Sequence, residues 1–234
     1  CHTEWLGLAG NANPLASKRT GQNLADFPLD EQCQILDYAR TTLMAAGAPA
    51  PVAFRAGNYG ANDDTLRALA SLGIAYDTSH CPAMVGQSAC RISLGSDVHD
   101  PLEHMGVIEV PVGSIGALGG GQRHAQITAL SLGEMLAAIR HAAASGQETF
   151  TLVSHSFELI NRRKLAANRV VRHRFAGLVK ALETMPGVTT GTYADTPPRV
   201  RSPVRASQPL PPSALRTGRR MAEQFVSNAL YGAL

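Results

Sequence analysis

Polar residues of catalytic type follow several short apolar stretches of this chain. Three groups stand out, Arg55 to Gly60, Asp77 to Ser79 and Ser154 to Glu158, and a fourth, His2 to Trp5, lies at the start of the sequence. In (β/α) barrels the loops after the strands converge on one face, so polar residues at strand ends can act together there. Guanidinium, carboxylate and imidazole groups gathered in this way can stabilise developing charge and donate or accept protons.

Each candidate also has a structural interpretation without catalysis. Arg55 can form a surface ion pair, Tyr59 can pack over a turn, and Asp77 can cap a helix. His155 can be a core or capping histidine, and His2 can be an ordinary residue near a terminus. Their co-occurrence at the ends of strands in one alternating chain is what favours a functional site.

Apolar spacing and turn residues predict the elements that would position these groups. Leu66, Leu69 and Leu72 share one helical face after a capping Asn62, and Ser131 opens another helix with capping-box spacing. Helices are predicted from about Asp30 to Gly47, from Asn62 to Gly73, from Ser131 through Ala142 and from Arg169 to Leu182, and strands over 51–55, 74–77, 107–112, 150–153 and 188–193. This alternation favours an α/β fold with a parallel sheet or barrel.

The remaining segments are rich in turn residues. Long loops are predicted over 7–27 and 79–106, and loops of that length are often lids or binding loops. Residues 197–212 are rich in Pro and Arg and are interpreted as a linker, followed by a short terminal helix over 214–234. The predicted domains are therefore 1–196 and 197–234.

Composition narrows the classes of protein. The 234 residues are 44% hydrophobic and 17% charged, which is typical of a globular domain. The net charge of +3 is too small to indicate nucleic acid, although basic residues crowd 162–174 and 199–220, either as a solvated face and tail or as a polyanion site. No apolar run reaches the roughly 18 residues of a membrane span. The lack of an initiator Met makes us expect sequence upstream of Cys1.

The cysteines show no metal-binding spacing. Cys33 falls in an apolar helical pattern and is predicted to be a small core residue. Cys81 and Cys90 flank a loop and could form a bridge, which spacing alone leaves open.

Several of these segments together resemble the polysaccharide deacetylases of the NodB-homology group (carbohydrate esterase 4). Arg55-Ala56-Gly57-Asn58-Tyr59-Gly60, with the helix after it, resembles the family's third motif, and Tyr76-Asp77-Thr78-Ser79 resembles its D-S-S segment. The strand from Val107 to Val112 resembles the E-x-P strand, and Leu152-Val153-Ser154-His155-Ser156-Phe157 resembles the terminal histidine motif. The resemblance covers about Cys1 to Asp195, in the family's order.

The resemblance implies a distorted (β/α) barrel that lacks its first strand here, and a metal-dependent hydrolase that removes acetyl groups from an amino sugar or other acetylated glycan. His155 would protonate the leaving amine and Arg55 would orient a catalytic aspartate. His2-Thr3 resembles the start of the family's histidine metal motif, so His2 would bind a divalent ion, zinc or similar. The substrate-binding candidates are Trp5, Asn58, Tyr59 and Asp77.

The chain departs from the family at two points. The residue four after His2 is Leu6 rather than histidine, and no pair of aspartates follows a strand, since Asp63-Asp64 falls at a predicted helix start. We therefore expect the catalytic base upstream of Cys1, a second metal ligand either there or elsewhere in the chain, and little acetate release from these 234 residues alone. A cellular location, bacterial cytoplasm or cell envelope, stays open.

Two other functions are compatible with the same residues. A sugar-binding barrel that has lost its metal would keep the groove without hydrolysis. A barrel glycosidase needs two opposed carboxylates, for which Glu109 and Glu158 are the obvious candidates.

Overall fold

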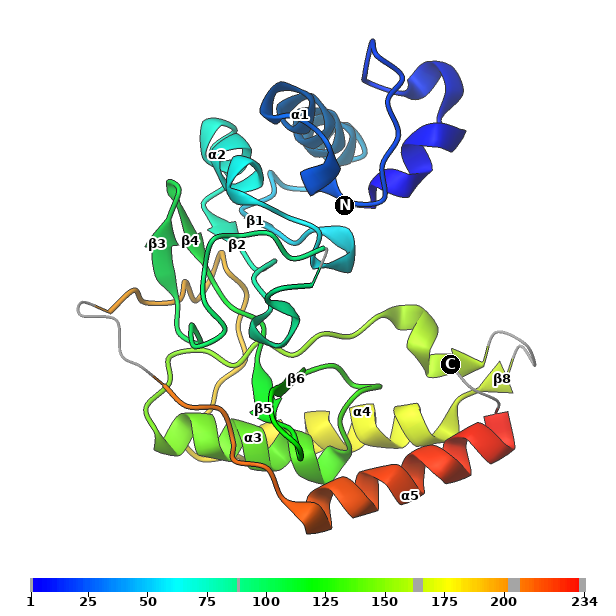
Figure 1. The fold of residues 1–234 in the computed structure, drawn as a ribbon, viewed down its shortest axis with the longest axis vertical. Coiled ribbons are helices and arrows are strands. Elements are labelled where there is room, and N and C mark those ends of the chain that lie inside the picture. The colour runs from blue at the N-terminus through cyan, green and yellow to red at the C-terminus, as the bar shows by residue number, and fades with distance from the viewer. Residues whose placement is uncertain (1, 88, 162–165, 202–206, 232–234) are drawn as a thin grey trace. The chain divides into compact units, whose positions relative to one another are not determined.

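The structure is a computed structural model that describes residues 2–87, 89–161, 166–201 and 207–231 (Figure 1). The chain divides into two compact units. The first unit comprises Cys1–Pro111 and Thr192–Ala206, and the second comprises Val112–Gly191 and Ser207–Leu234. This division differs from the predicted boundary at residue 197, which stays a prediction.

The helices and strands are short. The helices are α1 (Leu29–Ala45), α2 (Asp63–Ser71), α3 (Leu132–Ala144), α4 (Arg169–Leu182) and α5 (Ala214–Tyr231), with 3-10 turns η1 (Thr3–Leu8), η2 (Gly10–Ala12), η3 (Leu24–Asp26), η4 (Gly57–Tyr59), η5 (Pro82–Met84) and η6 (Ser156–Leu159). The strands are β1 (Ala53–Phe54), β2 (Tyr76–Asp77), β3 (Leu102–His104), β4 (Val107–Glu109), β5 (Ser114–Gly116), β6 (Gln122–His124), β7 (Ile160–Asn161) and β8 (Ala166–Ala167).

The first unit is built on a four-stranded sheet in the order β1-β2-β4-β3. β1, β2 and β4 are parallel, so their carboxyl ends share one edge, while β3 pairs antiparallel with β4. The helices α1 and α2 pack side by side (Figure 1). Ile35 and Leu36 of α1 and Leu66 and Leu69 of α2 are buried in one apolar cluster with Val107 of β4.

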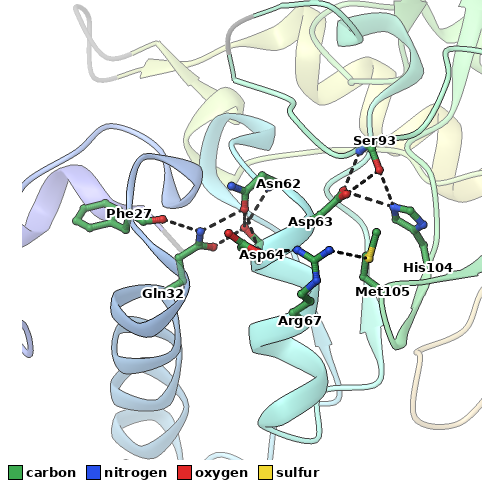
Figure 2. Close-up of polar contacts among 10 residues, drawn as sticks. Phe27, Gln32, Asn62, Asp63, Asp64, Arg67, Ser93, His104 and Met105 are labelled. Atoms are coloured by element: carbon green, nitrogen blue, oxygen red, sulfur yellow. Dashed lines mark hydrogen bonds and ion pairs between the residues drawn. The ribbon is translucent and has the colours of Figure 1, made fainter.

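The start of α2 is tied to α1 by a polar network (Figure 2). The side chain of Asn62 accepts a hydrogen bond from the backbone N–H of Thr65, at 3.0 Å, and so satisfies one of the helix's free donors. Gln32 of α1 donates to the same Asn62 oxygen at 3.2 Å and to the carbonyl of Phe27 at 2.8 Å. The predicted cap at Asn62 is confirmed, and the same side chain also joins two helices.

The second unit has a separate core between α3 and α4. Met135 and Ile139 of α3 are buried against Val171 and Leu178 of α4. The hairpin β5–β6 and the pair β7–β8 are two-stranded and antiparallel. Ser131 caps α3 as predicted, because its hydroxyl accepts from the backbone N–H of Glu134.

The α/β class is confirmed, and the described residues form three separate sheets with no closed barrel. Two predicted strands are wrong. Residues 150–153 make isolated bridges at Thr151 and Val153 rather than a continuous strand. Residues 188–193 form no strand, and the ring of Tyr193 instead packs on that of Tyr76, with centroids 5.3 Å apart.

The cysteines are free thiols. Cys81 and Cys90 are buried and form no bridge, and Cys33 packs partly buried against the apolar cluster of the first unit.

Among the described residues, every helix is too short or too polar to cross a membrane.

Candidate functional site

A cluster of buried polar residues lies at the carboxyl edge of the parallel strands in the first unit. Asp77, the last residue of β2, is in register with Glu109, the last residue of β4. Ser79 donates to Asp77 through its hydroxyl at 2.8 Å and its N–H at 2.9 Å, and the N–H of His80 donates to Glu109 at 3.0 Å. We call Asp77, Ser79, His80 and Glu109 the carboxyl-edge cluster.

The two carboxyl groups of this cluster affect each other's pKa. Burial raises the pKa of Asp77, against the lowering effect of hydrogen bonds from Glu109 and Ser79. Burial, and then the nearby charge of Asp77, raises the pKa of Glu109 well above its usual range. Two neighbouring carboxyls in a dry site resist ionising together, which favours the protonated form of Glu109.

The groups beside this pair are also uncharged at neutral pH. Burial lowers the pKa of His80 to about 4, and its Nε2 lies 3.1 Å from the carbonyl oxygen of Gly95. Burial, and then the neighbouring Cys90, raises the pKa of the Cys81 thiol to about 12. All four members of the cluster have no exposed surface. Asp77, predicted to bind substrate, therefore has no surface that a ligand can touch in this structure.

The cluster instead holds the loop that follows β1. The backbone N–H of Ala56 donates to the hydroxyl of Ser79 at 2.9 Å, and Ser79 in turn donates to Asp77. This chain of bonds fixes the point at which Arg55 leaves the strand. The carboxyl-edge cluster can therefore position the loop without contacting a ligand.

The same loop holds its backbone in an uncommon conformation. Asn58 and Tyr59 have φ values of 56° and 57°, in the left-handed region that side chains other than glycine rarely adopt. The loop is also packed from outside, since the N–H of Ala25 donates to the carbonyl of Gly60 at 3.0 Å. A Cβ on Gly60 would lie 2.5 Å from that of Asn23. Strained loops held by their surroundings are frequent at functional sites.

The other candidates of the first unit lie at its start. His2 is exposed, and its Nδ1 lies 2.9 Å from the carboxylate of Glu4. Trp5 is 65% exposed, so its ring is available to a ligand. Among the described residues, no group of three or more His, Cys, Asp or Glu side chains could hold a metal ion. His2 and Glu4 would supply two ligands and thus form an incomplete site.

His155 lies in the second unit, where a buried carboxylate orients it. Its Nδ1 is 3.3 Å from Glu158 Oε1, and its backbone N–H donates to Glu158 Oε2 at 3.1 Å. The side chain of Glu158 is 5% exposed, whereas that of His155 is 36% exposed. The imidazole also stacks on Phe157, with centroids 4.9 Å apart. A partly exposed imidazole with one ring nitrogen facing a buried carboxylate has the arrangement of a general acid or base.

Further hydrogen bonds hold Glu158 in place. Gln126 and Thr128 both donate to Glu158 Oε1, Thr128 at 3.2 Å, and Gln126 is itself 2.9 Å from Nε2 of His124. Because its oxygens accept several hydrogen bonds, Glu158 is held as an acceptor facing His155. We call His155, Glu158, Gln126 and Thr128 the histidine network.

A third polar group at the start of α2 was not predicted as a site (Figure 2). Asp63 accepts from the N–H of Ser93 at 2.9 Å and from its hydroxyl at 2.7 Å, and His104 lies 3.4 Å from the same carboxylate. Burial alone would raise the pKa of Asp63, but the bonds from Ser93 and the nearby His104 lower it. Asn62 is the cap of α2, and Asp63 in the first turn also ties Ser93 to the helix.

These residue types match a Ser-His-Asp triad, but their geometry does not. In a triad the imidazole uses one nitrogen for the serine and the other for the aspartate. Here the same nitrogen of His104, Nε2, faces both Ser93 and Asp63, and the hydroxyl of Ser93 donates directly to Asp63. This group is therefore a structural tie.

Comparison with protein-family models, with curated proteins and with solved structures finds no match for this chain. The resemblance in its motifs consequently enters the argument only as a basis for a proposal. Sequence reasoning named His155 and Asp77 and placed Ser79 in the same segment as Asp77, but it missed Gln126 and the role of Glu158 as the partner of His155. The spacing His155-x-x-Glu158 was the one signal available, since it matches a capping box.

Proposed function

We propose that this chain belongs to a hydrolase of the polysaccharide deacetylase type, which removes acetyl groups from an amino sugar or other acetylated glycan. The observation that carries the proposal is the histidine network, in which a solvent-accessible imidazole is oriented by a buried carboxylate. The order of the motifs along the chain supports it further. A distorted (β/α) barrel is the fold that this proposal implies.

In this proposal His155 is the general acid. The carboxylate of Glu158 accepts the Nδ1–H and stabilises the imidazolium, so Nε2–H is the proton that the leaving amine or alkoxide receives. Glu158 acts as a positioning residue, because it reaches the reaction only through His155. Proton transfer of this kind contributes roughly 10²–10⁴-fold to a rate.

The residues of the first unit would have supporting roles. Arg55 and Tyr59 would line the groove from the loop that Ser79 holds, and Asn58 and the exposed Trp5 would contact the sugar. Asp77 would act through Ser79 on the position of that loop. The family's divalent metal would polarise the acetyl carbonyl, with His2 as one ligand. Among the described residues, the set of ligands for this metal is incomplete.

The test is acetate release from a chitooligosaccharide and from an O-acetylated glycan, with added Zn²⁺ and with a chelator. It compares this chain with the complete open reading frame that encodes it. The proposal predicts metal-dependent release by the complete protein and a loss of release in H155A. Sugar binding by the complete protein with no acetate released would instead favour the inactive sugar-binding barrel.

A further inference from the structure

Helix α5 packs onto the second unit through its polar residues. Arg174 of α4 is 2% exposed, and it donates to the carboxylate of Glu223 through Nε at 3.1 Å and Nη2 at 2.9 Å. Arg220 Nε lies 3.7 Å from the buried Glu134 of α3. Ser227, one turn beyond Glu223, is also buried. The inward face of α5 is therefore charged and polar.

Four large apolar residues among the described side chains of α5 lie away from that face. At 100° per residue, Leu215, Met221, Phe225 and Val226 all lie about 90° or more from the centre of the arc formed by Arg220, Glu223 and Ser227. Their exposed fractions are 75%, 59%, 76% and 49%. A surface helix of a globular domain normally buries its apolar face and exposes its polar one, and α5 does the reverse. We call these four residues the outer apolar face.

The unit that carries this face has an excess of basic residues. The second unit holds twelve Lys and Arg against five Glu, a formal charge of +7, whereas the first unit holds nine against thirteen, a charge of −4. Exposed Arg219 lies beside Leu215 and Val226 on the helical wheel. From residue 207 onward the sequence holds one acidic residue, Glu223, which Arg174 engages.

These observations select among the occupants that could cover the outer apolar face. A symmetric dimer through this face would bring together two units of the same positive formal charge, which is unfavourable. Nucleic acid would satisfy the charge but would leave a leucine, a methionine and a phenylalanine unburied on the helix, since its outer surface is phosphate. A bilayer that contains anionic lipid accommodates both features.

We propose that α5 binds to the surface of a membrane bearing anionic lipid. The helix lies in the plane of the interface, with the outer apolar face among the acyl chains and Arg219 at the headgroups. Membrane binding by α5 does not depend on the proposed hydrolase activity. If both hold, the hydrolase acts at a membrane surface.

The test is co-sedimentation of the complete chain with phosphatidylcholine vesicles that contain or lack phosphatidylglycerol. We expect binding to the anionic vesicles, weakened by salt because charge attraction is screened. The double variant L215S/F225S removes apolar burial from the interface and should bind at least about tenfold more weakly. The charge variant R219E should also bind more weakly. L118S, which alters another exposed leucine of the same unit (51%), should bind as the unaltered chain does.

A second measurement keeps the test independent of folding. In F225W, the new indole should shift its emission to shorter wavelength when anionic vesicles are added, whereas L118W should show no such shift. Equal binding to neutral and anionic vesicles, or none to either, would overturn the proposal. So would a dimer in solution that L215S/F225S dissociates, or capture of duplex DNA that this variant retains.

Discussion

Glu109 and Asp77 end adjacent parallel strands, in register, with both carboxyl groups sealed from solvent. Burial raises the pKa of both carboxyls, and that of Glu109 well above its usual range. Because Asp77 also holds Ser79, and Ser79 holds the N–H of Ala56, the protonation of this pair acts on the loop of Arg55 and Tyr59.

The stability of the first unit should therefore depend on pH through Glu109. Its folded pKa is raised above the unfolded value of about 4.3, so the folded state binds more protons between the two values. The free energy of unfolding from this group is highest below about pH 4 and falls as pH rises toward the folded pKa, by up to about 1.4 kcal/mol per pH unit. Urea denaturation of E109Q across this range should give a flatter profile. The exposed control E103Q should follow the unaltered chain, and parallel profiles for E109Q would contradict the assignment.

Removal of the Ser79 hydroxyl should loosen the loop after β1. In S79A, the N–H of Ala56 and one oxygen of Asp77 lose their partners in a buried site, at a cost of about 1–3 kcal/mol. Hydrogen exchange measured by mass spectrometry should show faster exchange at Ala56. S71A, on the exposed side of α2, serves as the control, and unchanged exchange at Ala56 in S79A would exclude the proposed support.

The cap of α2 should contribute measurably to stability. N62A removes the acceptor for both Thr65 and Gln32, and we expect a loss of about 0.5–2 kcal/mol in urea denaturation. N62D has a carboxylate oxygen where Asn62 has its amide oxygen, so it should restore most of the lost stability. If N62D is as unstable as N62A, the bond to Thr65 is not the source of the effect.

The histidine network gives a prediction for kinetics in the complete protein. H155A should lower kcat by roughly 10²–10⁴-fold while leaving the unfolding midpoint nearly unchanged. E158Q keeps the shape of the partner but removes the carboxylate that faces Nδ1 of His155, so kcat should fall while the unfolding midpoint stays nearly unchanged. A kcat equal to that of the unaltered protein would remove Glu158 from the mechanism.

Helices were predicted correctly where the residues that determine them lie close together in the sequence. The helices α1, α2 and α3 were predicted from apolar spacing and from the caps Asn62 and Ser131, which depend on residues three or four apart. It failed where pairing between distant segments decides the structure. Residues 188–193 have strand-like residue types but no strand pairs with them, and Tyr193 packs on Tyr76 instead.

The same limit applies to the sites. Asp77 was named from its place after an apolar run, but its partner Glu109 lies far along the chain, and only the register of β2 and β4 brings the two together. Because Asp77 is buried, it holds the loop after β1 through Ser79 and has no surface for contact with a substrate. For the histidine network, the three-residue spacing between His155 and Glu158 was visible in the sequence, whereas the contributions of Gln126 and Thr128 depend on the fold of the second unit.

Gly60 has a consequence for how the chain tolerates substitution. The turn at Asn23 to Ala25 rests on the main chain of the Tyr59 loop, because Gly60 presents a carbonyl and no side chain at the point of contact. A residue with a side chain at position 60 would place its Cβ 2.5 Å from the Cβ of Asn23, so this turn would have to shift. The close approach of the two segments therefore restricts position 60 to glycine, although the residue there has no functional group of its own.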